Sequence, residues 1–253
     1  MKHIVQFSGG AGSAMAAYLV AQKVPKNDII LLFHDVRGGH DDDMYRFNAD
    51  VSEFLGLSIT EYSDERTIWE VIKEQKCLPS YPWHPFCTRI LKTEVADEFY
   101  SLLSSFVNPY SEQGFQLYPD EPFTLYNGYG ADEEKRIIKQ RKKAPYKTQY
   151  PVYDAGLTSA DCKRIISEEW KIELPRPYLL GFEHNNCIPC WKSGSKDYWR
   201  KVWKYYPERY QMAIEMEEYT GHTHFKKISL RELAEQWELE GKTKTSRGEV
   251  VPC

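Results

Sequence analysis

The first stretch of this sequence that could do chemistry is SGGAGSA, residues 8–14, which follows a short apolar run at the N-terminus. Gly9 and Gly10 permit positive φ and let backbone N–H groups approach an anion with no Cβ in the way. The helix expected from Ser13 adds the partial positive charge of its N-terminus, and the hydroxyls of Ser8 and Ser13 can donate to phosphate oxygens. The stretch lacks the Gly-Lys-Ser/Thr ending of the common triphosphate loop. It is therefore either a phosphate-binding loop of another kind or a tight turn that binds nothing.

Cysteines form the second group of candidate residues. The chain has six of them, and Cys187 and Cys190 make a CxxC pair with a proline inside it, CIPC. Two thiolates on one turn suit zinc, an iron–sulfur cluster or a redox dithiol, whereas simple burial of both thiols is the plain alternative. The sequence has no second CxxC that would complete a zinc ribbon. Cys162 lies in an apolar helical stretch and is expected only to pack.

Basic residues follow a third cysteine. Arg89 and Lys92 come directly after Cys87 in FCTRILK, where they either bind an anionic ligand or form an ordinary solvated helix start. A second basic stretch, residues 135–147, either forms a solvated helix face or binds a nucleic-acid backbone with an affinity that falls steeply with salt. Its cationic residues are Lys135, Arg136, Lys139, Arg141, Lys142, Lys143 and Lys147.

These residues need a scaffold, and the hydrophobic pattern predicts one. Apolar runs predict strands and amphipathic runs predict helices between them. The expected strands are 3–7, 29–33, 59–62 and 123–127, and the expected helices are 13–22, 43–55, 67–75 and 88–105. Strands and helices that alternate in this way predict a parallel sheet covered by helices on both faces. We therefore expect an α/β fold with a Rossmann-like, doubly wound, mainly parallel sheet.

The last third of the chain predicts helices at 196–205, 207–219 and 229–239. We expect a sheet domain over residues 1–180 and a cysteine-containing helical lobe over 181–253, packed together as one structural unit. The tryptophans and tyrosines of the lobe are spaced as core residues, with base stacking as the minority alternative.

Composition limits the class of protein. The chain of 253 residues is 42% hydrophobic and 28% charged, which excludes a mainly disordered chain, and its net charge of −4 argues against non-specific coating of DNA. No apolar run approaches the about 18–20 residues that cross a bilayer. We expect a cytoplasmic protein without membrane association or a disulfide framework.

Five segments together resemble one branch of the adenine nucleotide α-hydrolase superfamily, the phosphoadenosine phosphosulfate (PAPS) reductase-like proteins. SGGAGSA resembles the Ser-Gly-Gly-x-x-Ser pyrophosphatase loop (PP-loop) of that superfamily. The other four segments recur in the order of the family: FHD at 33–35, FCTRILK at 86–92, YPVYDAGLTSADC at 150–162 and GFEHNNCIPC at 181–190. The resemblance extends to about residue 221.

The resemblance implies that ATP, PAPS or adenylyl sulfate binds across the strand ends. It assigns the nucleotide to Ser8, Gly9, Gly10, Gly12, Ser13, Asp35 and Gly128. It also implies that Asp35 lies near the nucleotide or a Mg²⁺ ion, and that Arg89 and Lys92 meet the sulfate or phosphate end. Asp35, Arg89, Lys92 and Cys253 are the catalytic candidates.

The cysteines resemble those of adenylyl sulfate reductases, in which a tandem Cys-Cys and a later CxxC bind a [4Fe-4S] cluster. Cys87 matches one tandem cysteine and Cys187 with Cys190 matches the CxxC, while Phe86 replaces the other tandem residue. Cys77 or, less readily, Cys253 could supply a fourth ligand. One iron could instead lack a protein ligand, as in the cluster-dependent tRNA thiolases of the superfamily, and Zn²⁺ is a third option.

Two features depart from the reductase pattern. In NGYGADEEKRI, Gly130 stands where the Gly-x-Arg-x-x-Glu segment of the family has arginine, and that weakens the case for PAPS. The chain ends in SRGEVVPC rather than in the Lys-Thr-Glu-Cys-Gly tail that carries the nucleophile of the reductases.

Three functions follow from the resemblance. The first is ATP-dependent sulfur transfer through an adenylylated intermediate, with a tRNA or DNA acceptor and a sulfur donor such as a cysteine desulfurase. The second is reduction of PAPS or adenylyl sulfate to sulfite, which needs a thiol reductant. The third is a nucleotide-binding sensor or regulatory subunit without turnover. The oligomeric state is left open.

Overall fold

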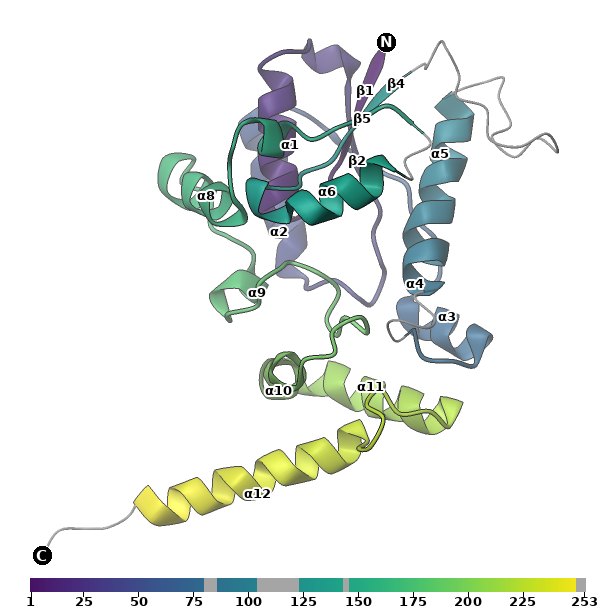
Figure 1. Cartoon of the computed structure of the whole chain (residues 1–253), viewed down its shortest axis with the longest axis vertical. Helices are drawn as coiled ribbons and strands as arrows, with labels where there is room; N and C mark the ends of the chain where they lie inside the picture. The colour runs from purple at the N-terminus through teal and green to yellow at the C-terminus, as the bar shows by residue number, and fades with distance from the viewer. Residues whose placement is uncertain (80–85, 104–122, 143–145, 249–253) are drawn as a thin grey trace, which may run out of the picture. The chain divides into compact units, whose positions relative to one another are not determined.

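The computed structural model in Figure 1 describes residues 1–79, 86–103, 123–142 and 146–248, with 241–248 described through their backbone alone. The chain divides into two compact units that interleave along the sequence. Residues 1–36, 40–64 and 90–185 form the first, here the sheet unit, and residues 37–39, 65–89 and 186–253 form the second, here the helical unit. The domain boundary at residue 180 stays a prediction. The helical unit differs from the predicted lobe because it also includes residues 37–39 and 65–89.

The sheet unit contains five parallel strands in the order β3-β2-β1-β4-β5. The strands are β1 Lys2–Gln6, β2 Ile29–Phe33, β3 Ile59–Glu61, β4 Phe123–Tyr126 and β5 Thr148–Gln149. The predicted parallel α/β sheet is confirmed, with β5 as an additional strand. The chain runs outward from β1 through β2 to β3 and then continues on the other side of β1 with β4. Open α/β sheets bind ligands beyond the carboxyl ends of their strands at such a switch point.

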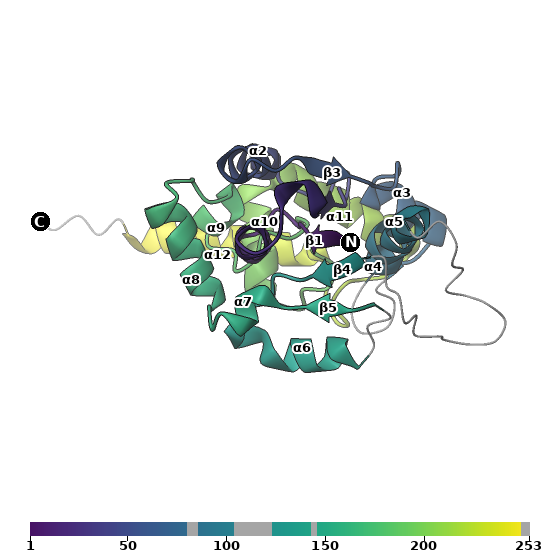
Figure 2. The ribbon, with the colours of Figure 1, turned by 90° about the horizontal axis from the view of Figure 1, so that it is seen from above.

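Helices cover both faces of this sheet, because side chains alternate between the faces of each strand. Val5 and Leu31 pack with α1, α2, α7 and α8, whereas Ile4 and Leu32 pack with α5. Figure 2 shows α1 and α5 on opposite sides of the strands. The helices of the unit are α1 Ala11–Ala21, α2 Asp43–Leu55, α5 Val95–Leu103, α6 Glu134–Arg141, α7 Pro151–Asp154, α8 Ser159–Arg164 and α9 Arg176–Leu179.

Short helical turns complete the element order. They are 3-10 turns at Lys26–Asp28 and Ala131–Glu133 and π-helical stretches at Arg89–Glu94 and Ile165–Glu169. The helix predicted over 88–105 is thus divided into a π-helical stretch and α5, and residues 104 and 105 lie outside the described residues.

The helical unit contains α3 Ile68–Gln75, α4 Phe86–Thr88, α10 Lys196–Tyr205, α11 Pro207–Thr220 and α12 Leu230–Gly248. The three predicted C-terminal helices are confirmed, and α12 is longer than predicted. Aromatic side chains form its core: Trp191 and Trp199 are 1% and 0% exposed and pack edge to face, with ring centroids 5.4 Å apart. Among the described residues, no helix has both the length and the apolarity to cross a membrane.

Candidate functional site

The glycine loop connects the central strand β1 to α1, at the carboxyl edge of the sheet. Gly9 has a φ of 71°, which L-residues with a side chain rarely adopt, and a Cβ there would lie 2.6 Å from the Met44 side chain. Asn48, 5% exposed, lies beside the same position, and its Oδ1 has no hydrogen-bond partner among the described residues. Helix α2 therefore packs so closely under the loop that only glycine fits at residue 9.

Hydrogen-bond donors converge inside the loop on a single oxygen, the hydroxyl oxygen of Ser13. The backbone N–H groups of Ser8 and Gly10 donate to Ser13 Oγ over 3.1 and 3.3 Å, and the Ser8 hydroxyl donates to it over 3.3 Å. Ser13 in turn donates to the Gly10 carbonyl over 2.8 Å. An oxygen that receives several N–H and O–H donors at a helix N-terminus has the surroundings that a phosphate oxygen requires.

Gly12 and Gly128 bring the start of α1 against the end of β4. A Cβ on Gly128 would lie 2.6 Å from the Ser13 backbone nitrogen and would overlap the Gly12 carbonyl; a Cβ on Gly12 would overlap the Gly128 carbonyl. Both predicted nucleotide-binding glycines are thus needed for a close contact between two backbones. Their part in nucleotide binding stays a prediction.

Two residues from the far end of the sheet unit hold the loop. The Tyr178 hydroxyl oxygen accepts from the Ala11 N–H over 3.3 Å, and the Asn185 amide donates to the Gly9 carbonyl over 2.7 Å. Sequence reasoning missed both residues, because an isolated tyrosine or asparagine carries no local signal. Only Asn185 lies in a family-like segment, GFEHNNCIPC at 181–190, which could have drawn attention to it.

Asp35 follows β2 and lies in a polar cluster. Its Oδ2 accepts from the Tyr45 hydroxyl over 2.8 Å, and its Oδ1 lies 3.0 Å from His40 Nδ1. The Asp35 N–H donates to Ser63 Oγ over 2.7 Å. Burial raises the pKa of Tyr45, and its hydrogen bond to Asp35 adds to that shift. The phenol therefore stays protonated as a donor to the carboxylate, which is held in one orientation at the strand end.

His34 precedes Asp35 and is 8% exposed. Its Nδ1 lies 2.6 Å from the Tyr62 carbonyl oxygen, so this nitrogen carries the proton, and Nε2 has no partner among the described residues. Burial lowers the pKa of His34, and the charge of Lys92 lowers it further. Lys92 is thus close enough to the carboxyl end of β2 to act on it electrostatically. Arg89 belongs to the helical unit, where it is exposed.

Two cysteines of the helical unit, Cys87 and Cys190, have raised pKa values, and a third cysteine contributes to both shifts. Burial raises the pKa of Cys87, and the neighbouring Cys187 raises it further. Burial also raises the pKa of Cys190, with Cys187 and Cys87 adding to the shift, while the backbone N–H of Lys192 opposes it. The predicted set of Cys87, Cys187 and Cys190 thus lies in one region of this unit.

The CIPC turn itself is held by Tyr198 on α10. The Cys190 N–H donates to the Tyr198 hydroxyl oxygen over 2.5 Å, and that hydroxyl donates to the Cys187 carbonyl over 3.1 Å. Arg209 donates to the Ile188 carbonyl over 3.0 Å. The turn is therefore fixed by side chains from two helices.

Half-buried Cys77 belongs to the same unit, and Cys253 lies outside the described residues. The five described cysteines form no disulfide with one another. In the part of the chain that the structure describes, no three His, Cys, Asp or Glu side chains are grouped as a metal site. The metal ligands therefore stay predictions. Cys162 is fully buried, as expected, and burial raises its pKa to about 12.

Residues 2–107 match the family model of the phosphoadenosine phosphosulfate reductase domain. The match to a PAPS reductase domain is therefore limited to residues 2–107. This result confirms the family resemblance and implies an adenine nucleotide as ligand. No curated protein matches the chain. The matched part includes the glycine loop, Asp35, Cys87 and Lys92, whereas Gly128 and the CIPC turn lie beyond it.

The loop at Gly130 differs from the pattern expected for this family for a structural reason. A Cβ on Gly130 would lie 2.5 Å from Asp132 Oδ1 and 3.1 Å from the Leu157 carbonyl oxygen. The Ala131 N–H donates to that same carbonyl over 2.8 Å, and the Ser159 N–H donates to Asp132 Oδ1 over 3.1 Å. The loop is closed against the N-terminus of α8, so an arginine could not replace Gly130 without rearrangement.

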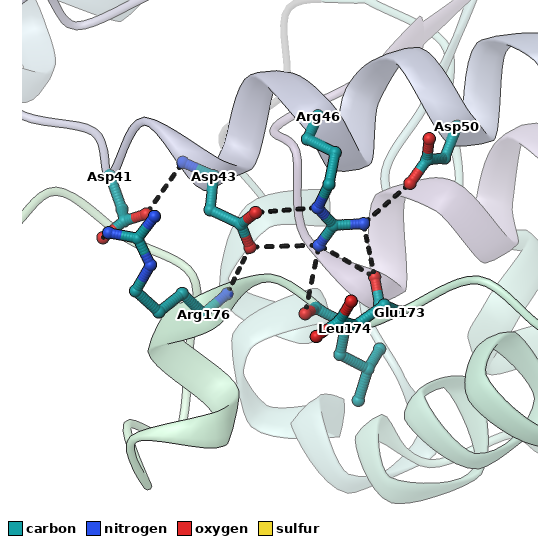
Figure 3. A network of polar contacts seen from close by, with 7 residues as sticks. All are labelled: Asp41, Asp43, Arg46, Asp50, Glu173, Leu174 and Arg176. Atoms are coloured by element: carbon teal, nitrogen blue, oxygen red, sulfur yellow. Dashed lines mark hydrogen bonds and ion pairs between the residues drawn. The ribbon is translucent and has the colours of Figure 1, made fainter.

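Figure 3 shows the network that fixes the segment before Tyr178. Arg46 on α2 donates to both carboxylate oxygens of Asp43 over 2.7 and 3.0 Å, to Asp50 over 2.7 Å, and to the Glu173 carbonyl over 3.2 Å. Asp43 also accepts from the backbone N–H of Arg176, the first residue of α9, over 2.7 Å. The hydrogen bond with Arg46 lowers the pKa of Asp43. The network thereby ties α2, which packs under the glycine loop, to α9, which carries Tyr178.

Proposed function

We propose that this chain is an ATP-dependent sulfurtransferase of the adenine nucleotide α-hydrolase type. The PAPS reductase domain supports an adenine nucleotide as ligand. The observation that carries the proposal is the convergence of the Ser8 N–H, the Gly10 N–H and the Ser8 hydroxyl on one oxygen position. These donors would hold phosphate oxygens of ATP at the switch point of the sheet.

The reaction proposed is attack at the α-phosphorus. An oxygen of the acceptor forms a bond to that phosphorus, the bond to the β-phosphate oxygen breaks, and pyrophosphate leaves. A sulfur nucleophile then displaces AMP from the acceptor, so that a carbon–oxygen bond is replaced by a carbon–sulfur bond. The loop has no lysine directed at a γ-phosphate, and this chemistry at the α-phosphate needs none. Asp35, held by Tyr45 and near His40, is the candidate ligand of Mg²⁺.

Cys87, Cys187 and Cys190 are the residues that we propose hold a [4Fe-4S] cluster, with Zn²⁺ as the alternative. The type of ligand fits, because cysteine sulfur binds both iron–sulfur clusters and Zn²⁺, and Cys187 contributes to the raised pKa of both Cys87 and Cys190. Such a cluster supplies an iron that can bind the transferred sulfur. Tyr198 and Arg209 would keep the CIPC turn in place as the group binds.

A nucleic acid is the acceptor that the surface of α6 favours. Lys135, Lys139 and Arg141 are exposed on this helix, and Ile137 is its buried residue. Arg136 is committed elsewhere, since it pairs with Glu133 over 2.8 Å. A polyanion could therefore bind along α6 although the whole chain has a charge of −4. Lys143, predicted as part of this surface, lies outside the described residues.

Reduction of PAPS is the second candidate function. Two observations weigh against it: the family's arginine is replaced by Gly130, in a loop that would have to rearrange to hold it, and the tail around Cys253 does not match. A nucleotide-binding subunit without turnover is the third candidate.

Pyrophosphate release tests the proposal. The purified protein, prepared without oxygen, is incubated with ATP, Mg²⁺ and either transfer RNA or duplex DNA, and pyrophosphate is measured. Release that depends on one nucleic acid supports sulfur transfer. Sulfite formation from PAPS without ATP would instead support the reductase, and ATP binding without release under all conditions would support the sensor. Iron and sulfide analysis of the same sample distinguishes a cluster from zinc.

A further inference from the structure

The hydroxyl of Tyr178 has an unusual set of partners. Its oxygen accepts from the N–H of Ala11, the first residue of α1, and from the N–H of Asn185. A phenol oxygen that accepts from two N–H groups has its acceptor capacity filled, but it still carries a proton to donate. Among the described residues, no acceptor for that proton is found. Within the described part of the chain, Tyr178 is therefore a donor without an acceptor.

The position of this hydroxyl relates it to the glycine loop. A Cβ built on Gly10 would lie 3.3 Å from the Tyr178 oxygen, so the hydroxyl lies directly over the loop. Burial raises the pKa of Tyr178 above its usual value, which keeps the phenol protonated at neutral pH. Two N–H donors on its oxygen also polarise the O–H bond and strengthen it as a donor.

Other contacts fix the ring and leave the hydroxyl at the loop. Lys163 Nζ lies 4.4 Å from the centroid of the Tyr178 ring, and the same ammonium donates to the Glu183 carbonyl over 3.0 Å. The Tyr178 N–H donates to the Pro175 carbonyl within the α9 turn over 2.9 Å. The ring is thus held on its face and through its backbone, and rotation of the hydroxyl proton is the remaining freedom.

A second side chain at the loop has unused hydrogen-bonding capacity. Asn48 is 5% exposed, and its Oδ1 lies 3.0 Å from the Cβ position of Gly9 without a partner among the described residues. Buried polar atoms are rarely left without partners unless a ligand or water completes them. The Asn48 oxygen can only accept a hydrogen bond, as a phosphate oxygen does, so the Tyr178 hydroxyl is the side chain here that could donate to a phosphate.

We propose that the Tyr178 hydroxyl donates a hydrogen bond to a phosphate oxygen of the nucleotide at the glycine loop and is part of the phosphate-binding site. This inference rests on the proposed function, which requires that the loop bind a phosphate-bearing nucleotide. It assigns to α9, about 170 residues along the chain from the loop, a direct part in phosphate binding.

Calorimetric titration of the full chain with inorganic pyrophosphate and with ATP tests the inference. Tyr178→Phe removes the hydroxyl and keeps the ring over Lys163, and we expect a loss of affinity of about 10- to 100-fold, the usual effect of one hydrogen bond to a charged group. Tyr153→Phe is the matched control, because the Tyr153 hydroxyl donates to Glu134 on the exposed surface. It should bind both ligands as the wild type does.

Fluorotyrosine at position 178 separates donation to the ligand from support of the loop. Ring fluorination makes the phenol a stronger donor and a weaker acceptor. If Tyr178 donates to phosphate, pyrophosphate affinity rises with fluorination; if it only accepts from the Ala11 N–H, affinity stays the same or falls, and the inference is wrong. Equal binding by Tyr178→Phe and wild type would also overturn it. A wild-type chain that binds neither ligand would instead refute the proposed function.

Discussion

Replacing Gly128 by alanine should disrupt the phosphate loop, although this residue lies more than a hundred positions from it in the sequence. The new Cβ would lie 2.6 Å from the Ser13 nitrogen and would overlap the Gly12 carbonyl, whereas ordinary contacts lie at 3.4–4 Å. The backbones of α1 and β4 must therefore separate by about 1 Å, since backbone atoms cannot rotate away as a side chain does.

The size of the effect follows from this displacement. The donors that meet Ser13 Oγ do so over 3.1 and 3.3 Å, and a further 1 Å would break these hydrogen bonds. A displacement of about 1 Å at a reacting centre can reduce activity about 100-fold. Overpacking also costs about 1–3 kcal/mol of unfolding free energy, which corresponds to a fall in Tm of about 2–12 °C.

Thermal unfolding and ATP titration of Gly128→Ala measure both effects. Gly194→Ala is the matched control, because a Cβ on Gly194 meets no atom within 4 Å. We expect Gly194→Ala to bind ATP and unfold as the wild type does. If Gly128→Ala binds ATP as tightly as Gly194→Ala and unfolds at the same temperature, the close contact between α1 and β4 does not exist as described.

Three further predictions follow from the network, the cysteines and α6. Arg46→Ala should destabilise the chain at neutral pH and weaken pyrophosphate binding through α9. Because Arg46 lowers the pKa of Asp43, the wild type should lose this stabilisation as the pH falls below about 4. In urea unfolding from pH 3 to 7, the unfolding free energy of the variant should therefore change less with pH than that of the wild type. Cys187→Ala should abolish bound iron or zinc, measured by metal analysis, whereas fully buried Cys162→Ala should retain it. Lys139→Glu, on the exposed face of α6, should weaken nucleic-acid binding and make the affinity less dependent on salt concentration, while ATP binding is unchanged. If the affinity of the variant and of the wild type falls equally steeply with salt, α6 is not the binding surface.

The sheet could be predicted because β2 is a continuous apolar run, β4 is mostly apolar and β1 has an apolar centre, and polar or glycine residues come soon after each of them. β5 was missed because it has only two residues, Thr148 and Gln149, which carry no pattern. The division of the helix after Cys87 was also missed, since a π-helical stretch such as Arg89–Glu94 has the same amphipathic residues as an ordinary helix.

The glycine loop could be predicted because its residues are consecutive, so their spacing carries the signal. The residues that complete it come from elsewhere: Gly128 follows β4, and Tyr178 and Asn185 follow α8. Long-range contacts of single residues leave no periodicity in a sequence. Gly130 illustrates the opposite case, because the sequence shows a lost arginine while the structure shows a loop in which a side chain at this position would force its neighbours to shift.

The absence of a lysine from the loop has a physical consequence. SGGAGSA offers N–H groups, hydroxyls and a helix N-terminus, and Tyr178 adds another neutral donor. Neutral donors bind an anion through geometry rather than through net charge, so ATP binding at the loop should depend only weakly on salt, whereas a polyanion on α6 should be released by it. A steep loss of ATP affinity between low and high salt would mean that cations outside the loop carry the binding. In that case the glycines of SGGAGSA would only place the backbone N–H groups of the loop. The positive charge that attracts the nucleotide would come from residues such as Lys92.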